Sequence, residues 1–67
     1  MKILVDYASA TTWYVGYAEP GTATSAALWR IVRITLNAAG DVTAAEFANG
    51  NRNFVSAFDD RAALSYS

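Results

Sequence analysis

The densest group of charged residues in this chain is the run Asp59-Asp60-Arg61. Two adjacent carboxylates beside a guanidinium could hold a divalent cation or act as an acid–base pair. Neighbouring strand residues point to opposite faces, however, and a calcium site needs about six oxygen ligands, usually from a spaced loop. We therefore expect these three residues to take part in a structural ion pair. Its members are drawn from this run or from the two strand arginines, Arg30 and Arg33.

No other group of polar residues has the spacing of a known catalytic or metal site. The 67 residues include neither His nor Cys, and Lys2 is the only lysine, so neither a catalytic triad nor a Ser-Lys dyad is expected. Carboxylates are the metal ligands that remain, and these suit calcium or magnesium rather than zinc. The run Gly21-Thr22-Ala23-Thr24-Ser25 lacks the second glycine and the lysine of a phosphate-binding loop. We expect no catalytic residue, no cofactor and no metal, and therefore a protein that is not an enzyme.

The aromatic residues are better candidates for a functional surface. Trp13, Tyr14, Tyr17 and Trp29 provide more rings than a core of this size needs. Trp29 lies in the most apolar segment and is expected in the core. Trp13 and Tyr17 share one face of a strand, so either this pair or Tyr14 points outward. Exposed rings of this kind could dock a protein partner or stack on a sugar.

Arg30 and Arg33 flank an apolar strand and are candidates for the same surface. Arginine is enriched at interface hot spots, where its guanidinium forks onto carboxylates. The alternative is a solvated strand face on which the arginine stems cover apolar surface. We predict an interface formed by Trp13, Tyr17, Arg30 and Arg33.

The length of the chain limits it to one small β domain, residues 1–67. A chain of this size buries only about 60% of its unfolded surface and usually gains stability from disulfides, a metal or assembly. Disulfides are ruled out because there is no Cys. Because 54% of the residues are hydrophobic and only 16% are charged, we expect part of the apolar surface to lie at a subunit interface. The isolated chain is expected to be oligomeric or poorly folded.

Charge and hydropathy exclude several classes of partner. The net charge is −1, and the five basic residues form no dominant positive patch for nucleic acid. The apolar start Met1-Lys2-Ile3-Leu4-Val5 ends at Asp6, which is too short for a signal peptide. No segment approaches the roughly 20 apolar residues of a membrane span. We expect no nucleic-acid, membrane or small-molecule partner, and synthesis in the cytoplasm.

The order of β-branched and aromatic segments predicts an all-β fold. Strands are expected at residues 2–7, 11–18, 26–36, 42–47 and 61–66, with turns at 19–22, 37–41 and 48–51. Residues 26–36 also fit an amphipathic helix capped by Ser25, but the run Ile31-Val32-Arg33-Ile34-Thr35 favours a strand. Residues 53–60 could add one short helical turn, capped by Asn53. Gly16 inside a strand indicates a bulge or a close approach of another segment.

These elements predict an antiparallel meander or small barrel of four to five strands. A meander of this size would lie as an open sheet on a neighbour or curl on itself. The residues expected in the core are Trp29, Ile31, Ile34, Val42, Phe47, Phe54, Phe58 and Leu64.

Two stretches of the chain resemble small proteins encoded by tailed bacteriophages and prophages. The first contains Tyr14-Val15-Gly16 and the run from Pro20 to Ile31, which reads PGTATSAALWRI. The second extends from Phe47 to Tyr66 and includes the sequence DDRA. The resemblance covers residues 11–67, with Phe at positions 47 and 58 where that group often has Trp.

This resemblance implies a structural protein of the virion, in the tail or baseplate or as a decoration of the capsid surface. Its implied partners are other virion proteins and copies of itself, and its implied location is the virion. Two other functions stay open on the residues alone. One is a carbohydrate-binding module that uses exposed aromatics, and the other is a small phage-encoded regulator of a host protein.

Overall fold

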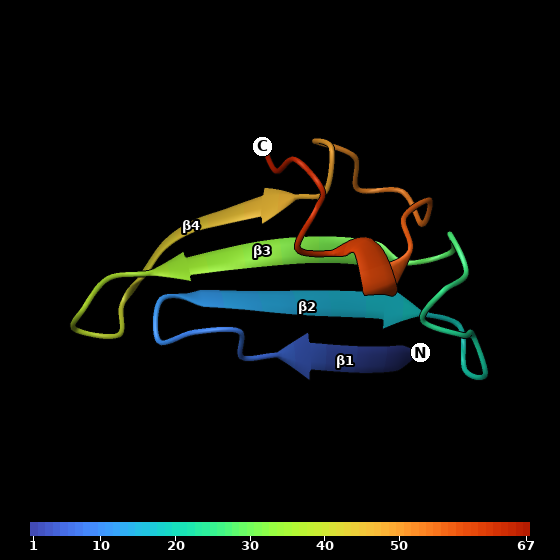
Figure 1. Ribbon diagram of the computed structural model, residues 1–67, viewed down its shortest axis with the longest axis horizontal. Helices are drawn as coiled ribbons and strands as arrows, with labels where there is room; N and C mark the ends of the chain where they lie inside the picture. The colour runs from blue at the N-terminus through green and yellow to red at the C-terminus, as the bar shows by residue number, and fades with distance from the viewer.

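The computed structural model describes all 67 residues and shows an all-β chain with one open, four-stranded sheet (Figure 1). The strands are β1 (Lys2–Asp6), β2 (Thr12–Ala18), β3 (Arg30–Leu36) and β4 (Val42–Phe47). They pair antiparallel in chain order, so the predicted meander is confirmed. The only helical element is a single 3-10 turn, η1 (Phe58–Asp60), inside the range expected for a helical turn. The sheet does not close into a barrel.

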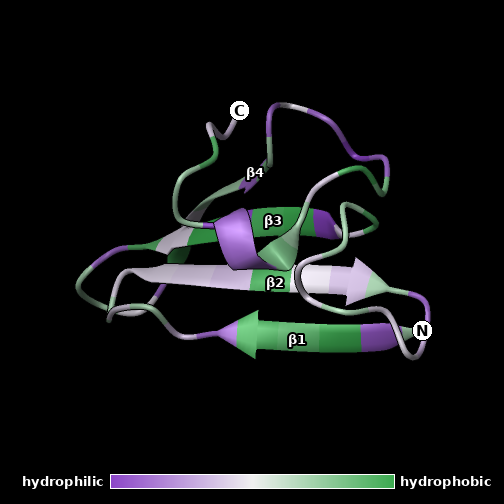
Figure 2. Ribbon diagram, turned by 45° about the vertical axis from the view of Figure 1, so that its right-hand side comes forward, coloured by the Kyte–Doolittle hydropathy of each residue, from purple (hydrophilic) through white to green (hydrophobic).

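The last part of the chain, residues 48–67, returns across one face of the sheet, and we call it the C-terminal segment (Figures 1 and 2). Two isolated bridges attach it, one between Trp29 and Ser56 and the other between Ala48 and Tyr66. We call the face beneath this segment the covered face and the opposite one the open face.

The strand expected at residues 61–66 is not formed. The chain continues to turn after η1, because the Arg61 amide donates to the Phe58 carbonyl and the Ala63 amide to the Asp60 carbonyl. Pairing is limited to the bridge between Tyr66 and Ala48, whose hydrogen bonds join Ser67 to Phe47 and Ser65 to Asn49. The residue that precedes η1 is Ala57, which has no side chain that can cap it, so Asn53 is not the cap.

The core lies between the covered face and the C-terminal segment. Its buried cluster consists of Ala18, Trp29, Ile31, Ala48 and Phe58, with Leu4, Leu64 and Tyr66 packed around it. Trp29 is fully buried, and its indole Nε1 donates to the Ala23 carbonyl at 2.9 Å. This hydrogen bond satisfies the one polar atom of the largest core side chain.

Gly16 marks a close approach rather than a bulge. β2 keeps a regular register with both neighbouring strands at this position. A Cβ atom on Gly16 would lie 2.5 Å from Cδ1 of Phe58 and 2.9 Å from Cε3 of Trp29. The missing side chain therefore makes room for the two largest rings of the core.

Four of the eight expected core residues lie in or against the core, namely Trp29, Ile31, Phe58 and Leu64. Ile34 and Phe47 are half-buried on the open face instead. Val42 and Phe54 are exposed, at 59% and 38%, so the expectation for them was wrong. Val42 begins β4 beside the 37–41 loop, away from the C-terminal segment, and Phe54 packs on the Arg30 guanidinium.

Candidate functional site

The open face carries three rows of side chains that run across the strands. Successive strand residues alternate between faces, so the neighbours of the core residues Leu4, Gly16 and Ile31 project from the open face. Strand register places them in the rows Ile3–Tyr17–Arg30, Val5–Val15–Val32–Phe47 and Trp13–Ile34–Ala45. Arg30 is the only charged residue among them. No segment of the chain crosses this face (Figures 1 and 2).

The open face is apolar and is most exposed along β1. Ile3 is 56% exposed and Val5 is 44% exposed, because β1 is an edge strand with no neighbour beyond it. Tyr7 follows β1 and meets the Trp13 ring edge-on, with ring centroids 4.9 Å apart. Val15, in the central row, is only 9% exposed because its neighbours on the same face surround it. The result is a continuous apolar surface and not a set of isolated exposed residues.

Arg30 stands at one end of the open face, held between two rings. Its guanidinium carbon lies 5.0 Å from the Tyr17 ring centre and 5.2 Å from the Phe54 ring centre. Both distances are within the range of a cation–π interaction. The Arg30 Nε atom is buried and has no hydrogen-bond partner. The single cation of this face is therefore stabilised by aromatic rings of its own chain.

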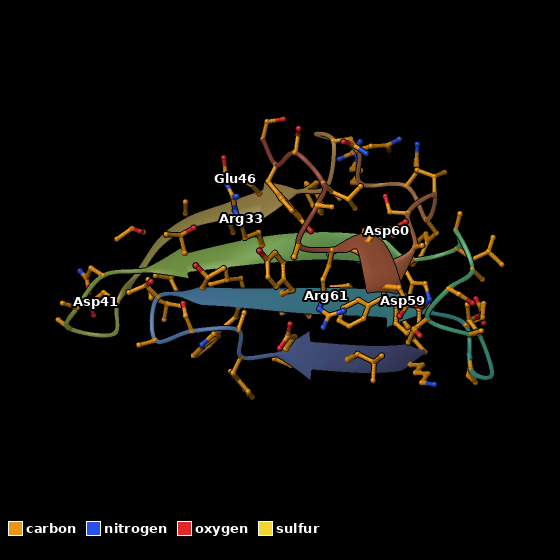
Figure 3. All side chains as sticks on the ribbon, in the orientation of Figure 1. Arg33, Asp41, Glu46, Asp59, Asp60 and Arg61 are labelled. Carbon is orange, nitrogen blue, oxygen red and sulfur yellow. The ribbon has the colours of Figure 1, made fainter.

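Arg33 lies on the covered face, away from the other three residues of the predicted interface. Its Nη2 donates to Oε1 of Glu46 at 2.9 Å, across the β3–β4 pair (Figure 3). Its guanidinium also stacks over Tyr66, 4.8 Å from the ring centre. The structure thus brings Trp13, Tyr17 and Arg30 to one face and uses Arg33 inside the fold.

Arg61 forms an ion pair, but with a different carboxylate from those expected. Its Nε donates to Oδ2 of Asp6 at 2.8 Å, and Figure 3 shows Arg61 extending toward β1. Asp59 and Asp60 are exposed on η1 and form no ion pair, so their expected role was wrong. The true partner is 55 positions away in the chain and could not be identified from local spacing.

Tyr66 contacts both Arg33 of the covered face and Arg61 of its own C-terminal segment. Its hydroxyl donates to the Arg61 carbonyl at 2.7 Å, and its ring packs near Tyr14, with centroids 5.7 Å apart. Burial of the phenol, with a smaller contribution from Tyr14, raises the pKa of Tyr66 to about 12, although Arg33 and Arg61 oppose this shift. A tyrosine with so high a pKa stays neutral at ordinary pH and acts here as a structural donor.

A shallow hollow of about 280 Å³ lies next to Phe54, lined by Glu19, Thr22, Leu28 and Phe54. Leu28 is 59% exposed at its rim. Glu19 is the one ionisable group that lines the hollow. No group of three or more His, Cys, Asp or Glu side chains is placed to hold a metal ion. No helix has the length and apolar character needed to cross a bilayer.

The strongest candidate site is therefore the open face, of which the sequence analysis identified Trp13, Tyr17 and Arg30. Ile3, Val5, Val15 and Val32 were not predicted as members of this face. The sequence did carry a signal for this apolar face. Apolar residues occupy every second position of one strand, at Trp13, Val15 and Tyr17. Comparisons of the chain with protein-family models, curated proteins and solved structures found no match in any of the three.

Proposed function

We propose that this chain is a small structural subunit of a tailed-bacteriophage virion and works through protein–protein contacts. The observation that carries the proposal is the uncovered apolar face of the sheet, with Ile3, Val5 and Trp13 at its surface. The resemblance of residues 11–67 to small phage-encoded proteins supports the setting. The tail or baseplate and the capsid surface are the two locations that this proposal allows.

The small core supports a role in assembly. Only nine of 67 residues are buried, and the chain has no cysteine to form a disulfide. Burial of apolar surface is stabilising, so a contact over the open face would add to the stability of the folded chain. Binding to the folded state alone raises stability by mass action, and a virion provides a high local concentration of subunits.

The chemistry of the open face favours a protein partner over a sugar. A site for a sugar combines an apolar or aromatic surface with several polar groups that fix the orientation of the ligand. Among the row residues, only Trp13, Tyr17 and Arg30 carry a polar side-chain group, and Arg30 already lies against two rings. The rest of this surface offers only apolar contact.

Mass spectrometry of purified virions, with the copy number per particle, tests the proposal. We expect the chain in washed particles at a fixed copy number. A number that matches the capsid lattice would place it on the capsid, and a number that matches the symmetry of the tail rings would place it in the tail. Absence from the particles would overturn the structural role and favour a regulator of a host protein.

A further inference from the structure

We propose that the open face binds the open face of a second copy of this chain, so that two four-stranded sheets form a two-layer sandwich. This inference rests on the proposed function, because it names the partner of the same contact surface. The other face of each sheet is already covered by the C-terminal segment (Figures 1 and 2). The dimer would therefore bury its two open faces against each other as a central core. The covered face of each sheet, with its C-terminal segment, would lie on the outside.

The shape of the surface favours a partner that is also a sheet. Strands twist with a fixed hand, so two sheets of equal twist pack face to face with their strands nearly aligned and their side chains interdigitated. The open face is built for such packing, since its rows mix β-branched and aromatic side chains around the central pair Val15 and Val32. A second copy provides a sheet of the same size and twist.

The charges favour a partner as uncharged as the face itself. Lys2, Asp6, Arg33 and Glu46 all have strand positions on the covered face. Arg33 pairs there with Glu46, and Asp6 pairs with Arg61 of the C-terminal segment. The open face keeps only Arg30, whose guanidinium lies between its own Tyr17 and Phe54 rings. No unpaired carboxylate or ammonium on this face requires an opposite charge from a different protein.

The position of Arg30 is compatible with two-fold symmetry. Arg30 lies in an end row, whereas Val15 and Val32 lie in the central row. A two-fold axis that crosses the strands at the central row places the Arg30 row of one copy over the Trp13 row of the other. The two guanidinium groups then lie at opposite ends of the interface, and each faces a row without a charged residue.

The size of the face is sufficient for a specific but modest association. The molecule measures 35 by 20 Å along the two longer axes, and Figure 1 shows the sheet in the central part of this outline, between loops at both ends. A surface of this outline contributes roughly 500 Å² per copy, or roughly 1,000 Å² in total, which is near the lower bound for a specific interface. We therefore expect a dimer that forms in the micromolar range and dissociates on dilution.

Sedimentation equilibrium of the purified chain from about 1 to about 500 µM tests the proposal. We expect the mass to rise from the 7.2 kDa of one chain to twice that value. Val5→Glu and Ala45→Glu place a carboxylate on the open face at positions that are exposed in the single chain, so neither removes a core contact. Each is expected to weaken association at least tenfold.

Ala63→Glu is the matched control, because Ala63 is an exposed alanine of the C-terminal segment, on the other side of the sheet. Circular dichroism confirms that each variant keeps the strand content of the parent chain. A folded parent chain that stays monomeric at the highest concentration overturns the proposal. Equal weakening by Ala45→Glu and Ala63→Glu, or none by Ala45→Glu, also overturns it.

These outcomes are separate from those of the virion experiment. A monomeric chain that is nevertheless present in particles would discard the second copy and keep the structural role. A dimer that is absent from particles would keep the second copy as partner and discard the virion setting.

Discussion

Asp6 and Arg61 are 55 positions apart in the chain and meet in one ion pair, with Nε of Arg61 2.8 Å from Oδ2 of Asp6. Asp6 ends the edge strand β1, and Arg61 follows η1 in the C-terminal segment. The ion pair therefore links the C-terminal segment to β1, the edge strand at the opposite side of the sheet from β4. Arg61 also donates from Nη1 to the Phe58 carbonyl and stacks 4.6 Å from the Phe58 ring centre.

Arg61→Ala is expected to lower the free energy of unfolding by about 1–3 kcal/mol, since it removes a half-exposed ion pair, a hydrogen bond and a ring contact together. Asp6→Asn removes only the charge of the partner and is expected to cost about 1 kcal/mol or less. Urea denaturation at fixed protein concentration measures both. Arg52→Ala is the control, because Arg52 is exposed and forms no ion pair. If all three variants matched the parent chain, the fastening role of Arg61 would be wrong.

Gly16→Ala is expected to destabilise the chain by about 1–3 kcal/mol through overpacking. The added methyl group would stand 2.5 Å from Cδ1 and 2.7 Å from Cε1 of Phe58, so the ring must move. Phe58→Leu removes the ring atoms that clash, and we expect the cost of Gly16→Ala to be smaller in that background. A double-mutant cycle by urea denaturation gives the coupling between the two positions. Additive effects would show that the close approach has no energetic consequence.

Tyr66→Phe is expected to change the alkaline stability of the chain. An unfolded tyrosine loses its proton near pH 10, whereas the pKa of Tyr66 in the fold is about 12. The folded state therefore favours the neutral phenol, and its contribution is fully present below pH 10 and is lost as the pH rises toward 12. Urea denaturation across this range should give a smaller loss of stability for Tyr66→Phe than for the parent chain.

At neutral pH the same variant loses the hydrogen bond to the Arg61 carbonyl and is expected to cost about 1 kcal/mol. Tyr7→Phe is the control, because Tyr7 is 67% exposed and its hydroxyl has no protein partner. An equal change of the alkaline slope in both variants would contradict the assignment to Tyr66.

Arg30→Lys is expected to cost about 0.5–1 kcal/mol, although the charge is kept. The planar guanidinium lies against two rings, Tyr17 and Phe54, and an ammonium cannot stack on both. Urea denaturation measures the effect, and Arg52→Lys at an exposed position is the matched control. A loss confined to Arg30→Lys supports the sandwiched geometry, and equal stability of the two variants argues against it.

The sheet could be predicted because its signals are local. β-branched and aromatic residues occupy the segments around Val15 and Ile31, and the loop that contains Gly40 separates the strands of the last hairpin. Strand pairing between neighbours in the sequence then follows from short connections. The 26–36 segment, for which a helix was the alternative, begins its strand at Arg30 and not at Ala26.

The remaining features depend on contacts between distant parts of the chain. The sequence between Ala48 and Ser67 has no strand or helix pattern strong enough to show that it crosses the sheet, so the covered face could not be chosen in advance. The partner of Arg61 and the exposure of Phe54 both follow from that crossing. Alternation showed that Trp13 and Tyr17 share a face, whereas only the placement of the C-terminal segment shows that this face is bare.

The placement of the C-terminal segment also determines how the chain can fold. Its core joins Leu4, Trp29 and Phe58, which come from three distant parts of the sequence. A meander of three or four strands needs at least one buried face for stability, and neither face is buried before this segment docks. Contacts between distant residues form only after the intervening loop has lost conformational entropy. Partly formed states carry this entropic cost without the contacts that offset it, so few of them are stable. Sheet formation and docking of residues 48–67 are therefore one cooperative event, slow for so short a chain.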